Sequence, residues 1–138
     1  MIKQILFIFS LALILFGCDN RKPTKYQIVG TWLSDDGGKL ILKEVGIFLL
    51  ESLPTGLFLR EAEDKGKTFA GSGKWELNND QSNWQLSLFF KQTSVEVYNF
   101  EMQLLISGEK GILENKPPWL LYLWKDQEGG DRYELRKQ

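Results

Sequence analysis

The sequence contains no histidine and only one cysteine, Cys18. Without histidine there can be no Ser-His-Asp triad, no Cys-His pair and no imidazole ligand for a metal ion. A lone cysteine cannot close an internal disulfide. These absences remove most nucleophilic and metal-dependent chemistries, and we expect neither a cofactor nor a metal.

The sequence also lacks an excess of charge of either sign. It has 17 Lys and Arg against 18 Asp and Glu, a formal net charge of -1. Nucleic-acid binding needs a concentrated basic footprint, so this balance argues against a nucleic-acid partner. The same balance argues against a broad electrostatic membrane-binding face.

No apolar run is long enough to span a membrane. Residues 5–16 form a twelve-residue, mostly apolar stretch after Lys3, whereas a span needs about 20 apolar residues. A short basic segment followed by such a stretch is typical of an export signal. We therefore expect residues 1–17 to be a removable signal peptide.

The signal ends in Leu15-Phe16-Gly17-Cys18, which resembles the lipobox of bacterial lipoproteins. The resemblance implies that the Cys18 thiol receives a diacylglycerol lipid and that the chain is cleaved before it. Its new amino group would then take a palmitate-type acyl chain. Two or three acyl chains anchor a protein stably in a membrane. Residues 18–25 would be a lipidated tether in the bacterial cell envelope, with the inner or outer membrane left open.

From residue 26 onward the chain alternates between apolar and polar residues with a period of two, which predicts β-strands. Ile28, Gly30 and Trp32 share one face of the expected first strand, and Asp/Gly-rich turns separate the strands. The pattern predicts about 8–10 short antiparallel strands in one all-β domain, residues 26–138. Such a count favours a closed up-and-down barrel or a strongly curved sandwich.

The segment Val29-Gly30-Thr31-Trp32 resembles the Gly-x-Trp motif that opens the first strand of lipocalin-like barrels. In that family the tryptophan plugs the closed end, and a basic residue near the last strand packs on it. The resemblance assigns this role to Arg132 or Arg136. The chain is shorter than a full lipocalin, and a small eight-stranded barrel can be hollow or filled by its own side chains.

Two groups of aromatic residues are candidate contacts for a ligand or a partner. Trp119, Tyr122 and Trp124 lie in a run that is apolar on both faces. One face could line a cavity or a partner-binding patch, or the run could be a central strand covered on both sides. Phe48, Phe58 and Phe69 flank loops that we expect to form the mouth of the barrel.

Acidic side chains cluster in two predicted loops, at Glu61, Glu63 and Asp64 and at Asp35-Asp36. Paired carboxylates could hydrolyse glycosides or bind Ca²⁺. Neither cluster has EF-hand spacing, and charged loops are usually only solvated. We therefore expect no enzymatic activity.

The sequence predicts a membrane-anchored envelope lipoprotein that binds a small apolar ligand or a protein partner. The alternative is a structural or inhibitory module with a filled barrel. A carboxylate-based hydrolase is the least favoured hypothesis.

Overall fold

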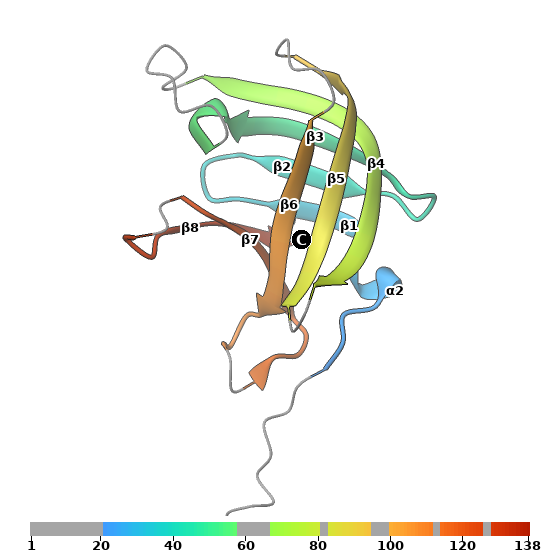
Figure 1. Ribbon diagram of the computed structural model, residues 1–138, viewed down its shortest axis with the longest axis vertical. Helices are drawn as coiled ribbons and strands as arrows, with labels where there is room; N and C mark the ends of the chain where they lie inside the picture. The colour runs from blue at the N-terminus through green and yellow to red at the C-terminus, as the bar shows by residue number, and fades with distance from the viewer. Residues whose placement is uncertain (1–20, 58–66, 81–82, 95–99, 112–113, 126–127) are drawn as a thin grey trace, which may run out of the picture.

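The protein is a closed antiparallel β-barrel of eight strands. Figure 1 shows how the strands curve around the barrel. The computed structural model describes residues 21–57, 67–80, 83–94, 100–111, 114–125 and 128–138. Each strand pairs with the next one along the chain, and β8 pairs with β1 to close the barrel. The predicted all-β up-and-down barrel is confirmed. The predicted signal peptide and Cys18 lie outside the described residues.

The eight strands follow one another along the chain in the order in which they pair. A four-residue helix, α2 (Lys25–Ile28), precedes the barrel, and a 3₁₀ turn, η1 (Thr55–Leu57), follows the third strand. The strands are β1 (Gly30–Leu33), β2 (Lys39–Leu42), β3 (Ile47–Pro54), β4 (Thr68–Asp80), β5 (Asn83–Thr93), β6 (Glu101–Gly108), β7 (Trp119–Trp124) and β8 (Arg132–Lys137).

Side chains from all eight strands fill the interior of the barrel. Alternate residues point inward, since successive side chains of a strand point to opposite faces of the sheet. Trp32, Phe48 and Leu86 have no exposed surface, and most of the other inward residues are almost as buried. A void large enough for water would expose part of the side chains that line it. These fully buried side chains therefore pack against one another without a water-sized void between them, as in a small barrel filled by its own side chains.

The first strand begins two residues later than its alternation predicts, because Ile28 belongs to α2. Thr24 caps the helix: its hydroxyl accepts a hydrogen bond from the Gln27 backbone N–H, and the Gln27 side chain accepts one from the Thr24 N–H. This reciprocal pair is a capping box, which satisfies backbone donors at the start of a helix. Ile28 nevertheless joins the core, with no exposed surface.

Helix α2 covers one end of the barrel, which we call the closed end. The Trp32 indole N–H donates to the Ile28 carbonyl over 2.8 Å. The Trp119 indole N–H donates to the Gln27 side-chain oxygen over 2.9 Å. The closed end also carries the β2–β3 turn (residues 43–46) and the end of β8 (Figure 1). The opposite end, the open end, carries the β1–β2 turn (residues 34–38) and the β7–β8 connection.

Candidate functional site

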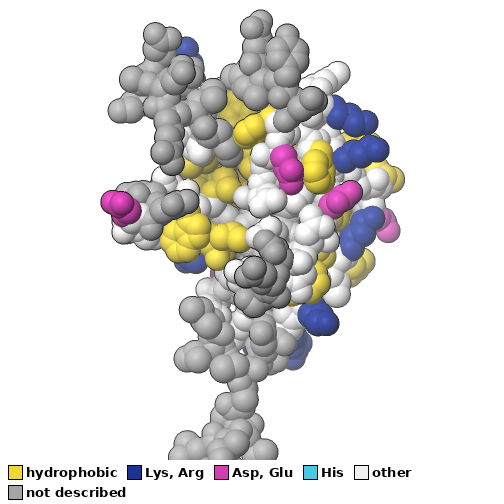
Figure 2. Space-filling model, in the orientation of Figure 1, with side chains coloured by type: hydrophobic (Ala, Val, Ile, Leu, Met, Phe, Trp, Pro, Cys, Tyr) yellow, Lys and Arg dark blue, Asp and Glu magenta, His cyan; other side chains and the backbone are white. Residues whose placement is uncertain are grey.

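The outer face of β7 carries the most exposed tryptophan of the described chain. Trp119 and Leu121 point into the barrel, whereas Leu120, Tyr122 and Trp124 point outward. Burial falls along this outward row, from Leu120 at 2% exposure to Trp124 at 47%. Figure 2 shows hydrophobic side chains gathered beside the β7–β8 hairpin, at the left of the view. The apolar row on β7 therefore becomes exposed to solvent near the open end.

Trp124 is held in place although almost half of it is exposed. Its ring stands edge-on to the ring of Tyr122, with centroids 5.7 Å apart and an interplanar angle of 87°. The Arg132 guanidinium lies 4.8 Å from the Tyr122 ring centre and 5.9 Å from the Trp124 ring centre. Both distances fall within the range of a cation–π interaction. We call Tyr122, Trp124 and Arg132 the outer aromatic face.

A row of ion pairs along β8 orients Arg132. Its Nη2 lies 2.9 Å from Oε1 of Glu134, and the other oxygen of Glu134 lies 2.8 Å from Nη2 of Arg136. Arg136 also pairs with Glu109 through its Nε, at 2.9 Å. Exposed ion pairs contribute little stability one by one, but a shared network limits the conformations of its members. The outer aromatic face is thus preorganised from the side of β8.

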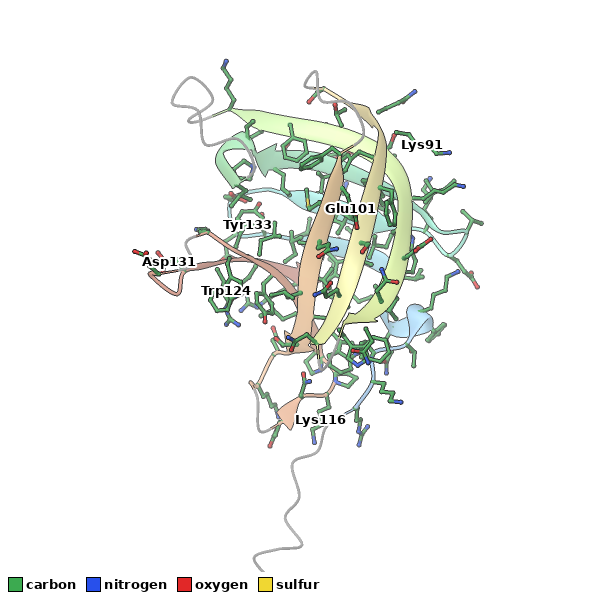
Figure 3. All side chains as sticks on the ribbon, in the orientation of Figure 1. Lys91, Glu101, Lys116, Trp124, Asp131 and Tyr133 are labelled. Atoms are coloured by element: carbon green, nitrogen blue, oxygen red, sulfur yellow. The ribbon has the colours of Figure 1, made fainter. Side chains whose placement is uncertain are left out.

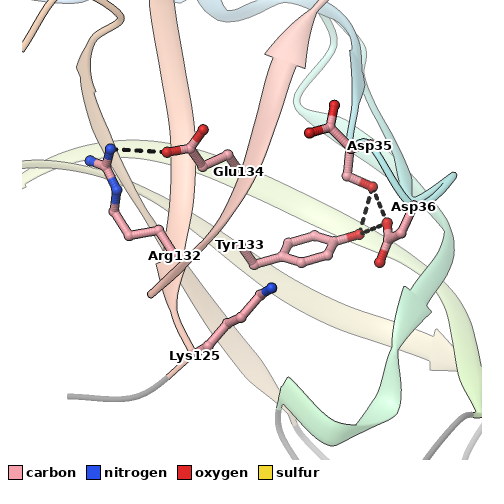
Figure 4. A pocket seen from close by; sticks show the side chains of 7 residues that line it. Asp35, Asp36, Lys125, Arg132, Tyr133 and Glu134 are labelled. Atoms are coloured by element: carbon pink, nitrogen blue, oxygen red, sulfur yellow. Dashed lines mark hydrogen bonds and ion pairs between the residues drawn. The ribbon is translucent and has the colours of Figure 1, made fainter. Parts of the chain in front are cut away.

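A small polar hollow adjoins the outer aromatic face. It has a volume of about 150 Å³ and is lined by Ser34, Asp35, Asp36, Lys125, Arg132, Tyr133 and Glu134 (Figure 4). Drug-sized ligands occupy pockets of roughly 300–1,000 Å³ with mainly apolar walls. This hollow is therefore too small and too polar for an acyl chain or a similar apolar ligand.

A hydrogen-bond network on one wall of the hollow joins the β1–β2 turn to β8. The Tyr133 hydroxyl lies 2.7 Å from Oδ1 of Asp36 and 2.7 Å from Oγ of Ser34. The Ser34 hydroxyl donates to Asp36 and accepts from the Gly38 backbone N–H over 2.8 Å. Between β1 and β8 themselves only two residue pairs are formed. The Tyr133 hydrogen bonds therefore add contacts between β8 and the turn after β1, next to the strand pair with the fewest paired residues.

The titration of this network suits a structural role. Partial burial alone would raise the pKa of Asp36, but hydrogen bonds from Ser34, Tyr133 and the Gly38 backbone outweigh it and lower the pKa. Burial, together with the neighbouring Asp36 carboxylate, raises the pKa of the Tyr133 phenol. Both groups are pushed away from neutrality, where general acids and bases work best.

The predicted contact residues separate into two sets. Trp119 is 4% exposed and belongs to the core, whereas Tyr122 and Trp124 form the outer aromatic face. Figure 3 shows Trp124 and Tyr133 on opposite sides of the β7–β8 ribbon. The prediction of a strand covered on both faces therefore holds at Leu120, which is 2% exposed, but is wrong at Trp124, which is 47% exposed although Arg132 lies opposite it on β8.

The phenylalanines expected at the mouth are core residues instead. Phe48 has no exposed surface and Phe69 only 3%. Both pack on Phe90, with ring centres 4.9 Å and 6.0 Å from its own. They point inward because their strand partners, Leu42 and Leu53, also do. The third member of the predicted set, Phe58, lies outside the described residues.

The basic residue beside the Gly-x-Trp motif is Lys137. It pairs directly with Trp32 across the β1–β8 seam, and paired residues point to the same face of a sheet. Arg132 lies against the outer aromatic face and Arg136 against Glu109, so neither takes the role that the resemblance assigned to them.

Gly30 lets Lys137 approach the backbone of β1. It has a φ of +139°, and a Cβ at this position would lie 2.7 Å from the Lys137 side chain. The Lys137 Nζ donates to the Gln27 carbonyl over 2.9 Å. The missing Cβ at Gly30 therefore leaves room for the Lys137 side chain.

Comparisons with family models, curated proteins and solved structures found no match. The residues that the structure describes bring no three His, Cys, Asp or Glu side chains together as a metal site would require. In the same part of the chain, no helix combines the length and the apolar character needed to cross a bilayer.

Proposed function

We propose that this protein is a lipid-anchored envelope module that binds a protein partner through its outer aromatic face. The anchor follows from the lipobox-like Leu15-Phe16-Gly17-Cys18. The binding role follows from the state of Trp124, which is 47% exposed yet held by Tyr122 and Arg132. Binding would scaffold or inhibit the partner, without covalent chemistry.

The composition of the outer aromatic face matches what protein interfaces use. Trp, Tyr and Arg dominate the few residues that carry most of the binding energy in such interfaces. A side chain that is already oriented loses less conformational entropy on binding than a mobile one. Arg132 and Glu134 supply a polar rim beside the two rings. The partner should offer an apolar pocket that accepts the Trp124 indole.

The packed interior favours a protein partner over a small apolar ligand. A carrier barrel needs an apolar void of several hundred cubic ångströms. Leu40, Leu88 and Leu104, from three different strands, point inward and have no exposed surface. The described strands therefore leave the outer wall, rather than the interior, as the place for recognition.

Site-specific photocrosslinking in cells tests this proposal. A photoreactive amino acid replaces Trp124 in the full-length chain, and the matched control replaces Phe89, which is 37% exposed on the outer wall of β5. We expect one discrete adduct from position 124 and none from position 89. Arg132→Ala should weaken the adduct, and Trp124→Ala should weaken binding of the captured partner by roughly 30-fold or more, as for an interface hot spot. The same adducts from both positions would contradict the proposal.

A further inference from the structure

Exposed large apolar side chains concentrate at the closed end of the barrel. Among the described residues, Tyr26 is 89% exposed, Val45 78% and Ile47 44%. Tyr26 belongs to α2, Val45 to the β2–β3 turn, and Ile47 to the first position of β3. Three separate side chains thus reach solvent at the end where α2 covers the barrel.

The turn that presents Val45 is fastened to its neighbour strand. Within the turn, the Gly46 N–H donates to the Lys43 carbonyl and the Lys43 N–H donates to the Ile47 carbonyl. Trp75 of β4 adds two bonds of 2.9 Å, from its backbone N–H to the Gly46 carbonyl and from its indole to the Lys43 carbonyl. Val45 is therefore displayed by a fixed turn rather than by a loose loop.

Tyr26 is displayed in a similar way, because α2 is bonded to Trp32, Trp119 and Lys137. The two displayed segments flank one hollow of about 480 Å³, lined by Lys25, Tyr26, Val29, Glu44 and Lys137. The hollow combines apolar walls with two ammonium groups and one carboxylate.

Cationic side chains surround these apolar residues. The chain entering α2, the β2–β3 turn and the end of β8 carry five cations against one acid, Glu44: Arg21, Lys22, Lys25, Lys43 and Lys137. Figure 2 shows Lys and Arg side chains along the right of the view, from its upper to its lower part, and Figure 1 places α2 on the same side. The β6–β7 connection beside them is balanced, with Glu109, Lys110, Glu114 and Lys116.

The described part of the open end carries four acids, Asp35, Asp36, Glu128 and Asp131, against the cations Lys67, Lys125 and Arg132. This end therefore lacks the excess of cations found at the closed end. The two ends therefore differ in charge although the whole chain is nearly neutral.

The chain leaves the described structure beside the closed end. The Arg21 N–H donates to the Asn115 carbonyl in the β6–β7 connection, and Pro23 is buried. Cys18 precedes Arg21 by three residues, a distance of about 10 Å when fully extended. A lipid on Cys18 would bring the closed end within that distance of a bilayer.

We propose that the closed end is a membrane-docking surface for an anionic bilayer, an inference that rests on the proposed lipid anchor. Tyr26 and Val45 enter the interfacial region, where the amphipathic ring of tyrosine is favoured. Lys25, Lys43 and their cationic neighbours contact lipid phosphates while their stems cover apolar surface. Docking holds the barrel upright, so that the outer aromatic face and the open end point away from the membrane.

A single fluorescent label measures this orientation. Because a lipidated Cys18 has no free thiol, Val45→Cys introduces the only reactive thiol of the mature protein, and Asp131→Cys at the open end is the matched control. Each lipidated protein is labelled with an environment-sensitive fluorophore and reconstituted into vesicles of phosphatidylethanolamine and phosphatidylglycerol. We expect quenching by lipid-borne quenchers to be several-fold stronger at position 45 than at position 131. The double variant Lys25→Glu/Lys43→Glu should lose that difference, as should vesicles of phosphatidylcholine alone.

The outcomes separate the two proposals. A protein that floats with the vesicles but shows equal quenching at both positions overturns docking and leaves the anchor intact. A protein that carries no acyl mass and does not float overturns the anchor, and the docking surface with it. Quenching at position 45 that persists in the double variant overturns the role given to the lysines.

Discussion

At the scale of single residues, the position of an aromatic side chain within its strand decides what it can do. Trp119 and Trp124 lie five residues apart on β7, an odd separation, so they point to opposite faces. One fills the closed end and bonds to Gln27, and the other is presented to solvent. The sequence identifies the aromatic run, but both faces are apolar there, so alternation alone cannot say which face is covered.

The Asp36 carboxylate should make stability depend on acid pH. Its pKa is lowered in the folded protein, so its stabilising effect is fully present above the unfolded pKa of about 3.9 and disappears as pH falls through the folded pKa. We expect Asp36→Asn to cost about 1 kcal/mol at pH 7, near the low end for bonds to a charged group because Asp36 is largely exposed.

Urea unfolding of both proteins between pH 7 and pH 2 measures this dependence. The difference in unfolding free energy should shrink as the pH falls below 4, towards its value for a neutral acceptor at position 36. Asp35→Asn, in the same turn, is the matched control. A difference that stays constant across the pH range would show that the charge of Asp36 is not involved.

At the scale of elements, α2 shows how a short helix can override a strand pattern. Ile28, Gly30 and Trp32 alternate as a strand would, yet the Thr24–Gln27 capping box begins a helix before them. The Thr24-x-x-Gln27 spacing was a readable signal of that start. What the spacing does not show is that Trp119, 92 positions away, also bonds to Gln27.

Gln27 should contribute more to stability than Thr24, because its side chain accepts hydrogen bonds both at the start of α2 and from Trp119 of β7. Thr24→Ala removes one cap, which typically costs about 1 kcal/mol. Gln27→Ala removes the reciprocal cap and leaves the indole N–H of buried Trp119 without its acceptor, adding about 1–3 kcal/mol. Urea unfolding followed by tryptophan fluorescence measures both costs. Gln27→Glu, which keeps an acceptor, should recover most of the loss; an equal loss in the Glu and Ala variants would refute the role of the bond.

At the scale of the whole molecule, the barrel has two ends with different surfaces. The closed end combines exposed apolar residues with an excess of cations, which the described part of the open end lacks. The near-neutral composition argues against a membrane-binding face only if the charges are evenly mixed. Folding distributes the charged residues unevenly between the two ends, because every second connection of an up-and-down barrel lies at the same end.

The proposed lipid anchor requires the thiol of Cys18. Cys18→Ser removes the thiol that would accept the lipid, so the precursor should keep residues 1–17 and show no acyl labelling. Metabolic labelling with a fatty-acid analogue and the mass of the purified chain check both expectations. Acyl labelling that survives in Cys18→Ser would mean that the lipid is attached elsewhere or that no lipobox operates.

The sequence by itself determined the class of the barrel, because alternation and closely spaced turns are local features that allow few other folds. Its absences also narrowed the chemistry, and it predicts the lipid anchor from Leu15 to Cys18. Only the tertiary structure decided that Lys137, rather than an arginine, lies beside Gly30, and that Trp124 is exposed while Phe48 is buried. Those outcomes depend on the register of strands far apart in the chain, above all on the β1–β8 seam. The difference in charge between the two ends also depends on the tertiary structure, because the closed barrel determines which turns lie together at each end.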